Sequence, residues 1–407
     1  MNRPSLFTKV MYRIAQKKGY HNKKEYHKLL KINQIPQNEL DSQEIVVYFF
    51  GTMGQVYQIK QWIDTFSELH KQHKITVVVR NFNVYRFWRK VLPFHIYYCY
   101  TINDMLSFYE TTHPKVIIYI NNGFKNFQSL IYEDALHIHI NHGESDKSSD
   151  HSNQVKGYDY IFVHGPNGYD NYMKYLIKLD PNQLVQTGRP QLDFIKPIKL
   201  DTFGRKVVIY APTWEATHRS MRYTSVDIYG EQIVDALLSD ERYYFIYKPH
   251  PNLGANDKKV LAIHQAMLEK IKNDPYAITI TDTDVNNIYP IVDFAIFDMS
   301  SIMTDYLNVD KPFILADVFD PLVHKVDDYN VLKGCNRLTL ENVENLLDVV
   351  TDEIDNDPMK AHREEIKRVY LGDYKQGESI KKFIDSVSNI IAQRDREVAQ
   401  KDSEVVS

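Results

Sequence analysis

Short apolar runs rich in β-branched and aromatic residues alternate with helical stretches along most of this chain. The first group of runs covers residues 44–50, 74–79, 115–120, 136–140 and 158–163. Apolar runs separated by helices are typical of parallel strands that helices cover on both faces. The pattern therefore predicts an open α/β domain built on a parallel sheet.

The same alternation restarts after a break near residue 195. The stretch T-G-R-P-Q-L-D (187–193) and the region around Pro197 look like a linker, and a second group of runs follows at 206–210, 243–247, 277–280, 293–297 and 312–316. At 407 residues the chain is also long for a single hydrophobic core. We therefore predict two open α/β domains in tandem, with a cleft between them.

This pattern divides the chain into four segments. We expect an N-terminal segment over 1–36, one domain over 37–195, a second over 196–375, and a C-terminal helix and tail over 376–407. The last helix carries one apolar stripe, which predicts that it packs on a domain: Ile380, Phe383, Ile384, Val387, Ile390 and Ile391. Beyond about Gln393 the sequence is mostly polar, and we expect this end to be frayed.

The N-terminal segment is strongly basic, because between residues 3 and 31 the lysines and arginines face only Glu25. Apolar residues recur there at three- and four-residue spacing, which predicts a basic amphipathic helix: Leu6, Phe7, Val10, Met11 and Ile14. Such a helix could lie on an anionic membrane surface. It could equally pack on its own domain with solvated lysines, and the sequence leaves both open.

The charge and cysteine content exclude several classes of protein. The net charge of −4 argues against a dedicated nucleic-acid binder, whose binding surface would show as a basic excess. Cys99 and Cys335 are too few for a disulfide framework and fit a reducing cytosol. No apolar run approaches the roughly 18 residues of a membrane span, and the N-terminus lacks the apolar core of a signal peptide. We expect a cytoplasmic protein.

Three histidines lie close together in H-I-H-I-N-H-G-E-S (137–145). If 136–140 is a strand, His137 and His139 share one face, whereas His142 lies beyond the strand end, next to Gly143. A zinc site is possible at this spacing, but no further Cys, His or carboxylate cluster is in register, so we expect no metal. We interpret the first two histidines as structural and His142 as a candidate base.

In open parallel sheets, ligands bind beyond the carboxyl ends of the strands. After the run 206–210, A-P-T-W-E (211–215) places Thr213 either in a rigid loop at the cleft or in a simple turn. After the run 243–247, prolines on both sides of His250 fix the backbone, and Lys248 adds charge. This arrangement is typical of an imidazole directed at a phosphate, although a proline-stiffened surface turn would have the same sequence.

A third strand-end motif is F-D-M-S-S-I-M-T-D-Y-L (297–307), where Ser300 or Ser301 can cap a helix that continues through Asp305. A helix start with two hydroxyls and free N–H groups can receive a diphosphate, although a plain N-cap would also explain it. Conversely, G-T-M-G-Q (51–55) lacks the third glycine of a dinucleotide fingerprint, and no P-loop follows any strand. Dehydrogenase and kinase functions are therefore disfavoured.

Taken together, five motifs occur in a fixed order: His142-Gly143, T-G-R-P-Q-L-D, Y-A-P-T-W-E, Y-K-P-H-P and F-D-M-S-S-I-M-T-D-Y. In this order they resemble the CDP-glycerol glycerophosphotransferases, the teichoic acid primases and polymerases of bacterial envelopes and their capsule-polymer relatives. The resemblance covers about residues 45–375. It implies a GT-B architecture, in which two Rossmann-like domains, for acceptor (37–195) and donor nucleotide (196–375), face an interdomain cleft.

The resemblance also implies residue roles. His142 matches the histidine that deprotonates the acceptor hydroxyl, His250 the one that contacts the donor diphosphate, and Asp305 a residue near the polyol. The implied site residues are, for catalysis, His142 and His250 and, for donor binding, Thr213, Lys248, Ser300, Ser301, Asp305 and Arg189. One departure is Glu144, which stands where the family leads us to expect threonine or serine, and which could alter acceptor recognition or tune His142.

The implied activity is transfer of a polyol phosphate, most simply glycerol phosphate, from CDP-glycerol or CDP-ribitol to a hydroxyl of a lipid-linked or oligosaccharide acceptor. CMP would be released, in teichoic acid or capsule synthesis at the inner face of the plasma membrane. Imidazoles and a helix start can stabilise the developing charge, so we expect no cofactor and no obligatory metal. The alternatives are a GT-B glycosyltransferase that uses a nucleotide sugar and a noncatalytic binding protein.

Overall fold

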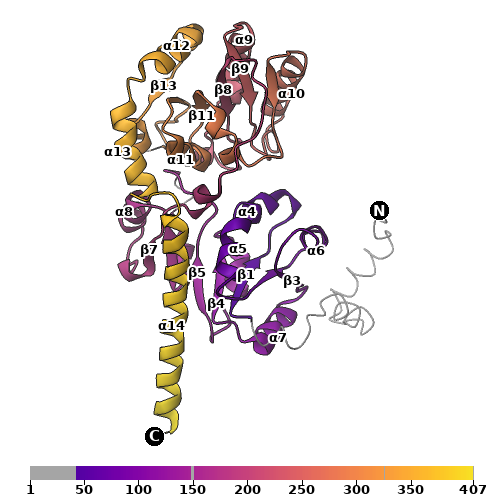
Figure 1. Cartoon of the computed structure of the whole chain (residues 1–407), viewed down its shortest axis with the longest axis vertical. Coiled ribbons are helices and arrows are strands. Elements are labelled where there is room, and N and C mark those ends of the chain that lie inside the picture. Colours follow the sequence, from indigo (N-terminus) through magenta and orange to yellow (C-terminus); the bar gives the residue numbers. More distant parts are fainter. Residues whose placement is uncertain (1–42, 148–150, 325, 407) are drawn as a thin grey trace, which may run out of the picture.

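The computed structural model describes residues 43–147, 151–324 and 326–406. These residues form two α/β domains stacked end to end, as Figure 1 shows. The basic amphipathic helix expected within residues 3–31 lies outside the described residues, and so does its proposed membrane contact.

The first domain is built on a parallel seven-stranded sheet with the order β3-β2-β1-β4-β5-β6-β7. Its strands are β1 (Ile45–Phe49), β2 (Ile75–Val79), β3 (His95–Tyr98), β4 (Val116–Tyr119), β5 (Leu136–His139), β6 (Tyr160–Val163) and β7 (Leu184–Gln186). Every residue of the central strand β1 is buried, because both faces of the sheet are covered. This explains the continuous apolar runs in place of an alternating pattern.

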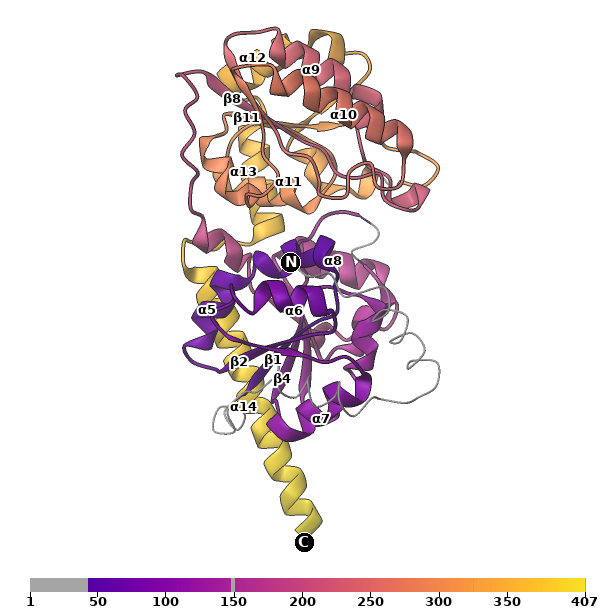
Figure 2. The ribbon, with the colours of Figure 1, turned by 90° about the vertical axis from the view of Figure 1, so that its right-hand side faces the viewer.

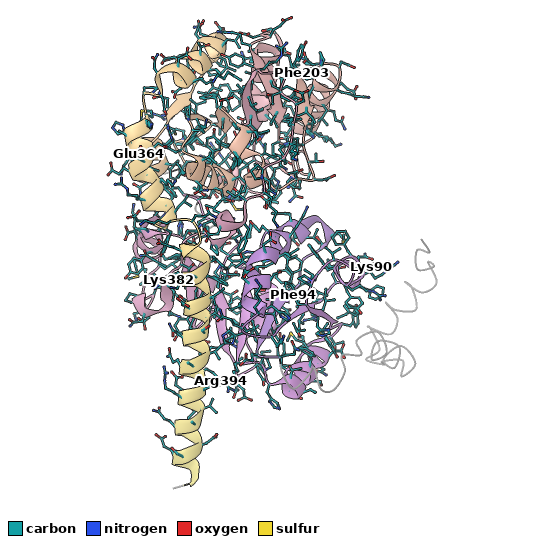
Figure 3. All side chains as sticks on the ribbon, viewed as in Figure 1. Lys90, Phe94, Phe203, Glu364, Lys382 and Arg394 are labelled. Carbon is teal, nitrogen blue, oxygen red and sulfur yellow. The ribbon has the colours of Figure 1, made fainter. Side chains whose placement is uncertain are left out.

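Helices cover both faces of this sheet: α4 (Val56–Lys60), α5 (Ile63–His70), α6 (Phe82–Trp88), α7 (Ile102–Thr112) and α8 (Pro166–Tyr175). On one face, Phe66 of α5 and Trp88 of α6 enter a core that also contains Phe94. On the other face, Tyr109 of α7 and Tyr172 of α8 enter a second core. Figure 3 shows Phe94 among the side chains of this domain.

The second domain is built on a parallel six-stranded sheet with the order β10-β9-β8-β11-β12-β13. Its strands are β8 (Lys206–Ala211), β9 (Tyr243–Tyr247), β10 (Ala277–Thr279), β11 (Phe294–Phe297), β12 (Phe313–Ala316) and β13 (Asn336–Leu338). Its helices are α9 (Glu231–Leu238), α10 (Lys258–Lys272), α11 (Ser301–Tyr306), α12 (Leu346–Asn356) and α13 (Lys360–Leu371). The order β9-β8-β11 repeats the order β2-β1-β4 of the first sheet, so the two domains share one architecture.

The last helix, α14 (Glu378–Val406), runs back along the first domain, as Figures 1 and 2 show. Its apolar stripe is buried in the first core through Phe383 and Val387, which confirms the expected packing on a domain. The carboxylate of Asp193 accepts hydrogen bonds from the N–H groups at the start of the helix. The expectation of a frayed end beyond Gln393 is wrong. The helix continues to Val406, and Asp395 pairs with Lys115 of the first domain at 2.7 Å.

All ten expected runs are strands, and three further strands escaped sequence analysis: β3, β7 and β13. Each of the three lies at the edge of its sheet. An edge strand pairs on one side only and is less completely buried, so its sequence need not be a continuous apolar run. The segment of β13, N-R-L, illustrates this, because two of its three residues are exposed.

Candidate active site

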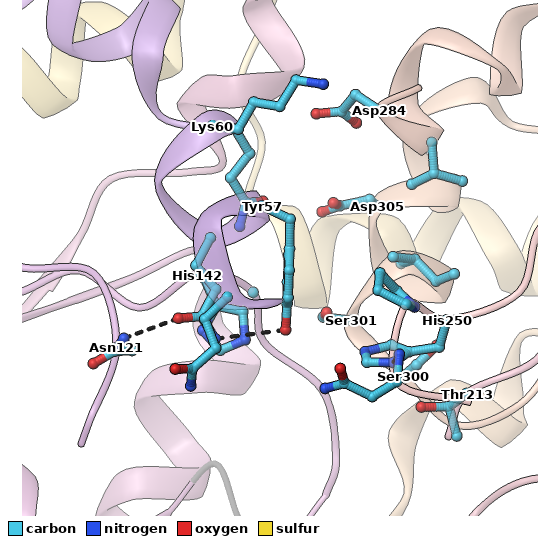
Figure 4. Close-up of a pocket in the computed structure, with 18 of the residues that line it drawn as sticks. Tyr57, Lys60, Asn121, His142, Thr213, His250, Asp284, Ser300, Ser301 and Asp305 are labelled. Atoms are coloured by element: carbon cyan, nitrogen blue, oxygen red, sulfur yellow. Dashed lines mark hydrogen bonds between the residues drawn. The ribbon is translucent and has the colours of Figure 1, made fainter. Parts of the chain in front are cut away.

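A pocket of about 600 Å³ lies between the two domains (Figure 4). It is lined by α4 and by segments that follow β4, β5 and β7 in the first domain and β8, β9, β10 and β11 in the second. All eight residues implied as site residues line it: Arg189, His142, Thr213, Lys248, His250, Ser300, Ser301 and Asp305. They come together because the carboxyl ends of both sets of parallel strands point at the interface.

His142 lies just beyond β5, and its ring is half-buried. Its Nδ1 is enclosed in the protein and has no hydrogen-bond partner. Burial, together with the positive charges of Arg189 and Lys147, lowers the pKa of His142 to about 4, although the nearby backbone of Ile120 acts in the opposite direction. The imidazole is therefore neutral at pH 7, and as a residue that lines the pocket His142 can act as a proton acceptor.

The close contact between the two domains explains why a glycine, Gly143, follows His142. A Cβ at this position would lie 2.6 Å from the side chain of Ser301, which is closer than carbon atoms approach. The loop after β5 in the first domain thus meets the start of α11 in the second at van der Waals contact. Only glycine permits this approach.

His250 lies beyond β9, and its environment determines which nitrogen carries the proton. Its Nδ1 accepts a hydrogen bond from the Asn252 backbone N–H at 3.1 Å, so in the neutral ring the proton is on Nε2. The ring stacks on Trp214, with centroids 5.8 Å apart and planes at 13°. Burial, Lys147 and His142 lower the pKa of His250 to about 3. His250 therefore presents a neutral N–H donor.

Tyr57 of α4 contacts both histidines and was not found by sequence analysis. Its ring centroid lies 6.2 Å from that of His142 and 6.1 Å from that of His250, edge-to-face in both cases. Figure 4 shows Tyr57 reaching from the first domain toward the second. The segment that contains Tyr57 follows strand β1, so a search for polar residues after each strand could have found it.

Three lysines bring positive charge to the pocket. Lys147, on the same loop as His142, places Nζ 3.3 Å from Oγ1 of Thr213 in the other domain. Lys60 donates to the Asp282 carbonyl at 3.0 Å and so also reaches across the interface. Lys248 donates to the Thr281 carbonyl at 3.2 Å, and burial lowers its pKa. Sequence analysis had identified only Lys248.

Arg189 and Asp305 form a buried ion pair across the interface. Nε of Arg189 lies 3.0 Å from Oδ1 of Asp305, and Nη2 lies 3.2 Å from Oδ2. Both residues are only 3% exposed. The guanidinium also donates to the His142 carbonyl at 3.0 Å. In this structure the Asp305 carboxylate is therefore engaged by Arg189 and by the Asn286 side chain.

Asp298, directly after β11, holds two strand-end loops together. Its carboxylate accepts hydrogen bonds from the backbone N–H groups of Thr213 at 2.7 Å and Ser225 at 3.2 Å, and burial raises its pKa to about 7.

Ser300 occupies the N-cap position of α11, but its hydroxyl donates to the Asp298 carbonyl at 3.2 Å and does not cap the helix. Since α11 has six residues, its macrodipole is small, and the pocket's cations are the main source of positive potential.

The remaining residues of the histidine cluster have other roles. His137 bonds to the Tyr119 hydroxyl and the Tyr132 carbonyl, and His139 stacks on Tyr158, as expected for structural histidines. The carboxylate of Glu144 accepts a hydrogen bond from the backbone N–H of His164 and does not line the pocket.

In the parts of the chain that the structure describes, no group of three His, Cys, Asp or Glu side chains could hold a metal ion. No helix among the described residues is long and apolar enough to cross a membrane.

Comparison with known proteins identifies the family. The chain matches the family model of CDP-glycerol:poly(glycerophosphate) glycerophosphotransferase over residues 109–389. Among solved structures, wall teichoic acid polymerase TagF is similar with a TM-score of 0.58 and 15% identity, over 88% of this chain and 91% of that chain.

Two epimerases share the fold. A putative UDP-N-acetylglucosamine 2-epimerase from Listeria monocytogenes has a TM-score of 0.60 and 12% identity, over 86% of this chain and 98% of its own. UDP-GlcNAc 2-epimerase from Neisseria meningitidis has a TM-score of 0.55 and 13% identity, over 85% and 100%. No curated protein sequence matches this chain significantly. The family match and the two-domain fold show that the chain belongs to the CDP-glycerol:poly(glycerophosphate) glycerophosphotransferase family and is a glycerophosphotransferase-like enzyme of GT-B architecture.

Proposed function

We propose that this enzyme transfers glycerol phosphate from CDP-glycerol to a hydroxyl of a lipid-linked or oligosaccharide acceptor in teichoic acid synthesis, releasing CMP. The observation that carries the proposal is the pairing of two neutral imidazoles in one pocket, one from each domain. His142 is a neutral imidazole that can accept a proton, whereas His250 offers an N–H donor at Nε2. The family match and a TagF structure obtained with a CDPG soak support this donor.

The reaction needs a proton acceptor at the incoming hydroxyl. The acceptor oxygen attacks the phosphorus of the glycerol phosphate group, a new P–O bond forms, and the bond to CMP breaks. The hydroxyl proton passes to the imidazole of His142 as the oxygen attacks.

The reaction also needs stabilisation of the negative charge that builds on the phosphate oxygens and on the leaving CMP. The Nε2–H of His250, the ammonium groups of Lys147 and Lys248, and the Ser301 hydroxyl line the pocket from both domains. Donors and cations that are already in place need no reorganisation during the reaction, so they act mainly on the transition state. Lys147, which comes from the loop of His142, is therefore assigned to the donor phosphates.

The lowered pKa of His142 predicts the pH dependence of the reaction. The base must be neutral, and a histidine whose pKa lies at about 4 is neutral at every pH above that value. The acid limb of kcat/KM, which reports the free enzyme, should therefore fall well below the ordinary histidine pKa of about 6.5. Initial rates measured as a function of pH check this. An acid limb at or above pH 6.5 would contradict the assigned base.

Substrate specificity is the direct test of the proposed function. The purified protein is incubated with CDP-glycerol, CDP-ribitol or UDP-sugars and an acceptor, and the products are weighed by mass spectrometry. We expect CMP release and growth of the acceptor by one glycerol phosphate with CDP-glycerol. If the acceptor gains only glycerol phosphate, CDP-ribitol and UDP-sugars are excluded as donors. If it gains ribitol phosphate or a sugar, CDP-glycerol is not the donor.

A nucleotide-sugar glycosyltransferase is the second candidate, because the epimerases that share this fold are named for UDP-N-acetylglucosamine. Thermal unfolding with each nucleotide separates the two. A ligand present at about 100 times its Kd stabilises the native state by about 2.7 kcal/mol. Stabilisation by CDP-glycerol and not by UDP-sugars supports the first function, and the reverse pattern supports the second.

A further inference from the structure

The loop that carries His142 also contains a buried carboxylate, Asp146, which has no role in the reaction described above. The loop follows β5, and its residues Ser145 and Lys147 line the pocket, whereas Asp146, which lies between them, does not. Asp146 is only 7% exposed. The groups that bind Asp146 inside the protein therefore help to determine where its two neighbours lie in the pocket.

Asp146 contacts both domains. One carboxylate oxygen accepts a hydrogen bond from the Asn167 side chain of α8, in the first domain, at 3.1 Å. The other oxygen accepts a hydrogen bond from the Tyr370 hydroxyl of α13, in the second domain. The amide oxygen of Asn167 in turn accepts a hydrogen bond from Asn330, also in the second domain, at 2.8 Å. We call Asp146, Asn167, Asn330 and Tyr370 the interdomain clamp.

The two helices of the interdomain clamp contact each other where the domains meet. α8 and α13 lie side by side at the interface, as Figure 1 shows. A Cβ on Gly165, directly before α8, would lie 2.7 Å from the backbone carbonyl oxygen of Tyr370, which is closer than these atoms approach. The backbone that carries Tyr370 is therefore packed tightly against the first domain, and its hydroxyl has a fixed position.

The residues on either side of Asp146 also contact the second domain. The Glu144 carbonyl accepts a hydrogen bond from the Thr304 hydroxyl of α11 at 2.8 Å. Nζ of Lys147 lies 3.3 Å from the hydroxyl oxygen of Thr213 and 5.3 Å from the centre of the Tyr223 ring. Lys147 is thus held at its own side chain and, through Asp146, at the preceding residue.

The chemistry of Asp146 suits a holding role. Taking a carboxylate out of water costs free energy, and an apolar side chain at this place would avoid that cost. Burial raises the pKa of the Asp146 carboxyl, although the hydrogen bonds from Tyr370 and Asn167 act in the opposite direction. What a carboxylate adds is two acceptor oxygens that point in different directions. Here one oxygen binds each domain, and the loop is fixed relative to both.

We propose that Asp146 is a positioning residue, which through the interdomain clamp holds Lys147 at the phosphates of the donor. This rests on the proposed function, in which Lys147 binds those phosphates, and deepens it. Because each domain supplies part of the clamp, contact between the domains and placement of Lys147 are coupled. A cation that is already in place stabilises the transition state without reorganisation during the reaction.

A double-mutant cycle on kcat/KM for CDP-glycerol tests the link to Lys147. Tyr370→Phe and Asp146→Ala should each lower kcat/KM on the order of 10-fold, because a small displacement of a group that contacts the substrate costs activity. Asp146→Asn keeps one acceptor oxygen and should lie between Asp146→Ala and the wild type. In a Lys147→Ala background, neither Tyr370→Phe nor Asp146→Ala should lower kcat/KM further.

The matched control is Tyr229→Phe. Tyr229 is 2% exposed, its hydroxyl donates to the Asp317 carbonyl at 3.0 Å, and it does not line the pocket. This variant loses a hydrogen bond within the second domain and should be less stable in thermal unfolding, but it should keep the wild-type kcat/KM. If Asp146→Ala and Tyr370→Phe lower kcat/KM equally with and without Lys147, Asp146 does not act through Lys147 and the proposal is overturned.

Hydrogen exchange followed by mass spectrometry tests the interdomain clamp without any substrate. In Tyr370→Phe and Asp146→Ala, peptides that cover residues 142–147 should exchange on the order of 10-fold faster than in the wild type, because the loop opens more often. In Tyr229→Phe these peptides should exchange at the wild-type rate. Unchanged exchange in both clamp variants would also overturn the proposal. If the wild type releases no CMP from CDP-glycerol, the proposed function fails, whereas the exchange rates still show whether the clamp holds the loop.

Discussion

Replacing His142 with alanine should reduce CMP release from CDP-glycerol by about 10²–10⁴-fold, the usual contribution of a general base. The loss should lie in kcat, with little change in the affinity for donor, because the imidazole acts on the acceptor hydroxyl and not on the nucleotide. His142→Asn should be similarly inactive, because an amide cannot accept the proton.

Stability measurements show whether the loss of activity comes from the missing base or from unfolding of the variant. The ring of His142 is half-buried and its Nδ1 has no hydrogen-bond partner, so its removal should change the thermal unfolding midpoint only slightly. His362→Ala on the exposed side of α13 is the matched control and should retain full activity. Full turnover in His142→Ala, at wild-type stability, would remove His142 from its assigned role.

Breaking the Arg189–Asp305 pair should produce the largest loss of stability. Each residue is 3% exposed, and truncating either one leaves an unpaired charge in the interface. Loss of one partner of a buried pair typically lowers the free energy of unfolding by about 3–5 kcal/mol. Arg189→Met and Asp305→Leu should each show this loss in denaturant unfolding. The double variant should be less destabilised than either single variant, because no charge is left unpaired.

The matched control for this pair is an exposed one. Lys196 and Asp64 lie 3.0 Å apart with side chains 71% and 48% exposed, and Lys196→Ala should cost less than about 1 kcal/mol. The Arg189 variant should also lose transfer activity, because its guanidinium holds the carbonyl of His142. If both single variants unfold like the wild type, the pair does not hold the two domains together.

Much of the fold could be predicted from the sequence, because a strand that is buried on both faces of a parallel sheet is a continuous apolar run. The runs that became β1, β2 and β4 are continuous and apolar since each strand is buried on both faces. The edge strands β3, β7 and β13 lack that signal. The extent of α14 was underestimated for a related reason, because polar residues beyond Gln393 are held by contacts such as Lys115–Asp395.

The sequence could predict which strand-end residues come together in the site, but not the contacts between them. His142, Thr213, His250 and Ser300 each follow a strand, and the carboxyl ends of parallel strands gather at one edge, so their convergence could be expected. Tyr57 in α4 and Lys147 in the loop after β5 also follow strands but lack a recognisable motif. Their importance becomes visible only when ring and charge distances across the pocket are known.

The sequence by itself determined two parallel α/β domains and the set of strand-end loops that face the cleft, since both follow from local patterns of apolar and turn-forming residues. Only the tertiary structure decided that Arg189 and Asp305, 116 residues apart, neutralise each other, and that His142 and His250 meet in one pocket as neutral imidazoles. The physical reason is that ion pairing and burial depend on neighbours in space. Most of those neighbours belong to the opposite domain or to distant loops, which local sequence does not encode.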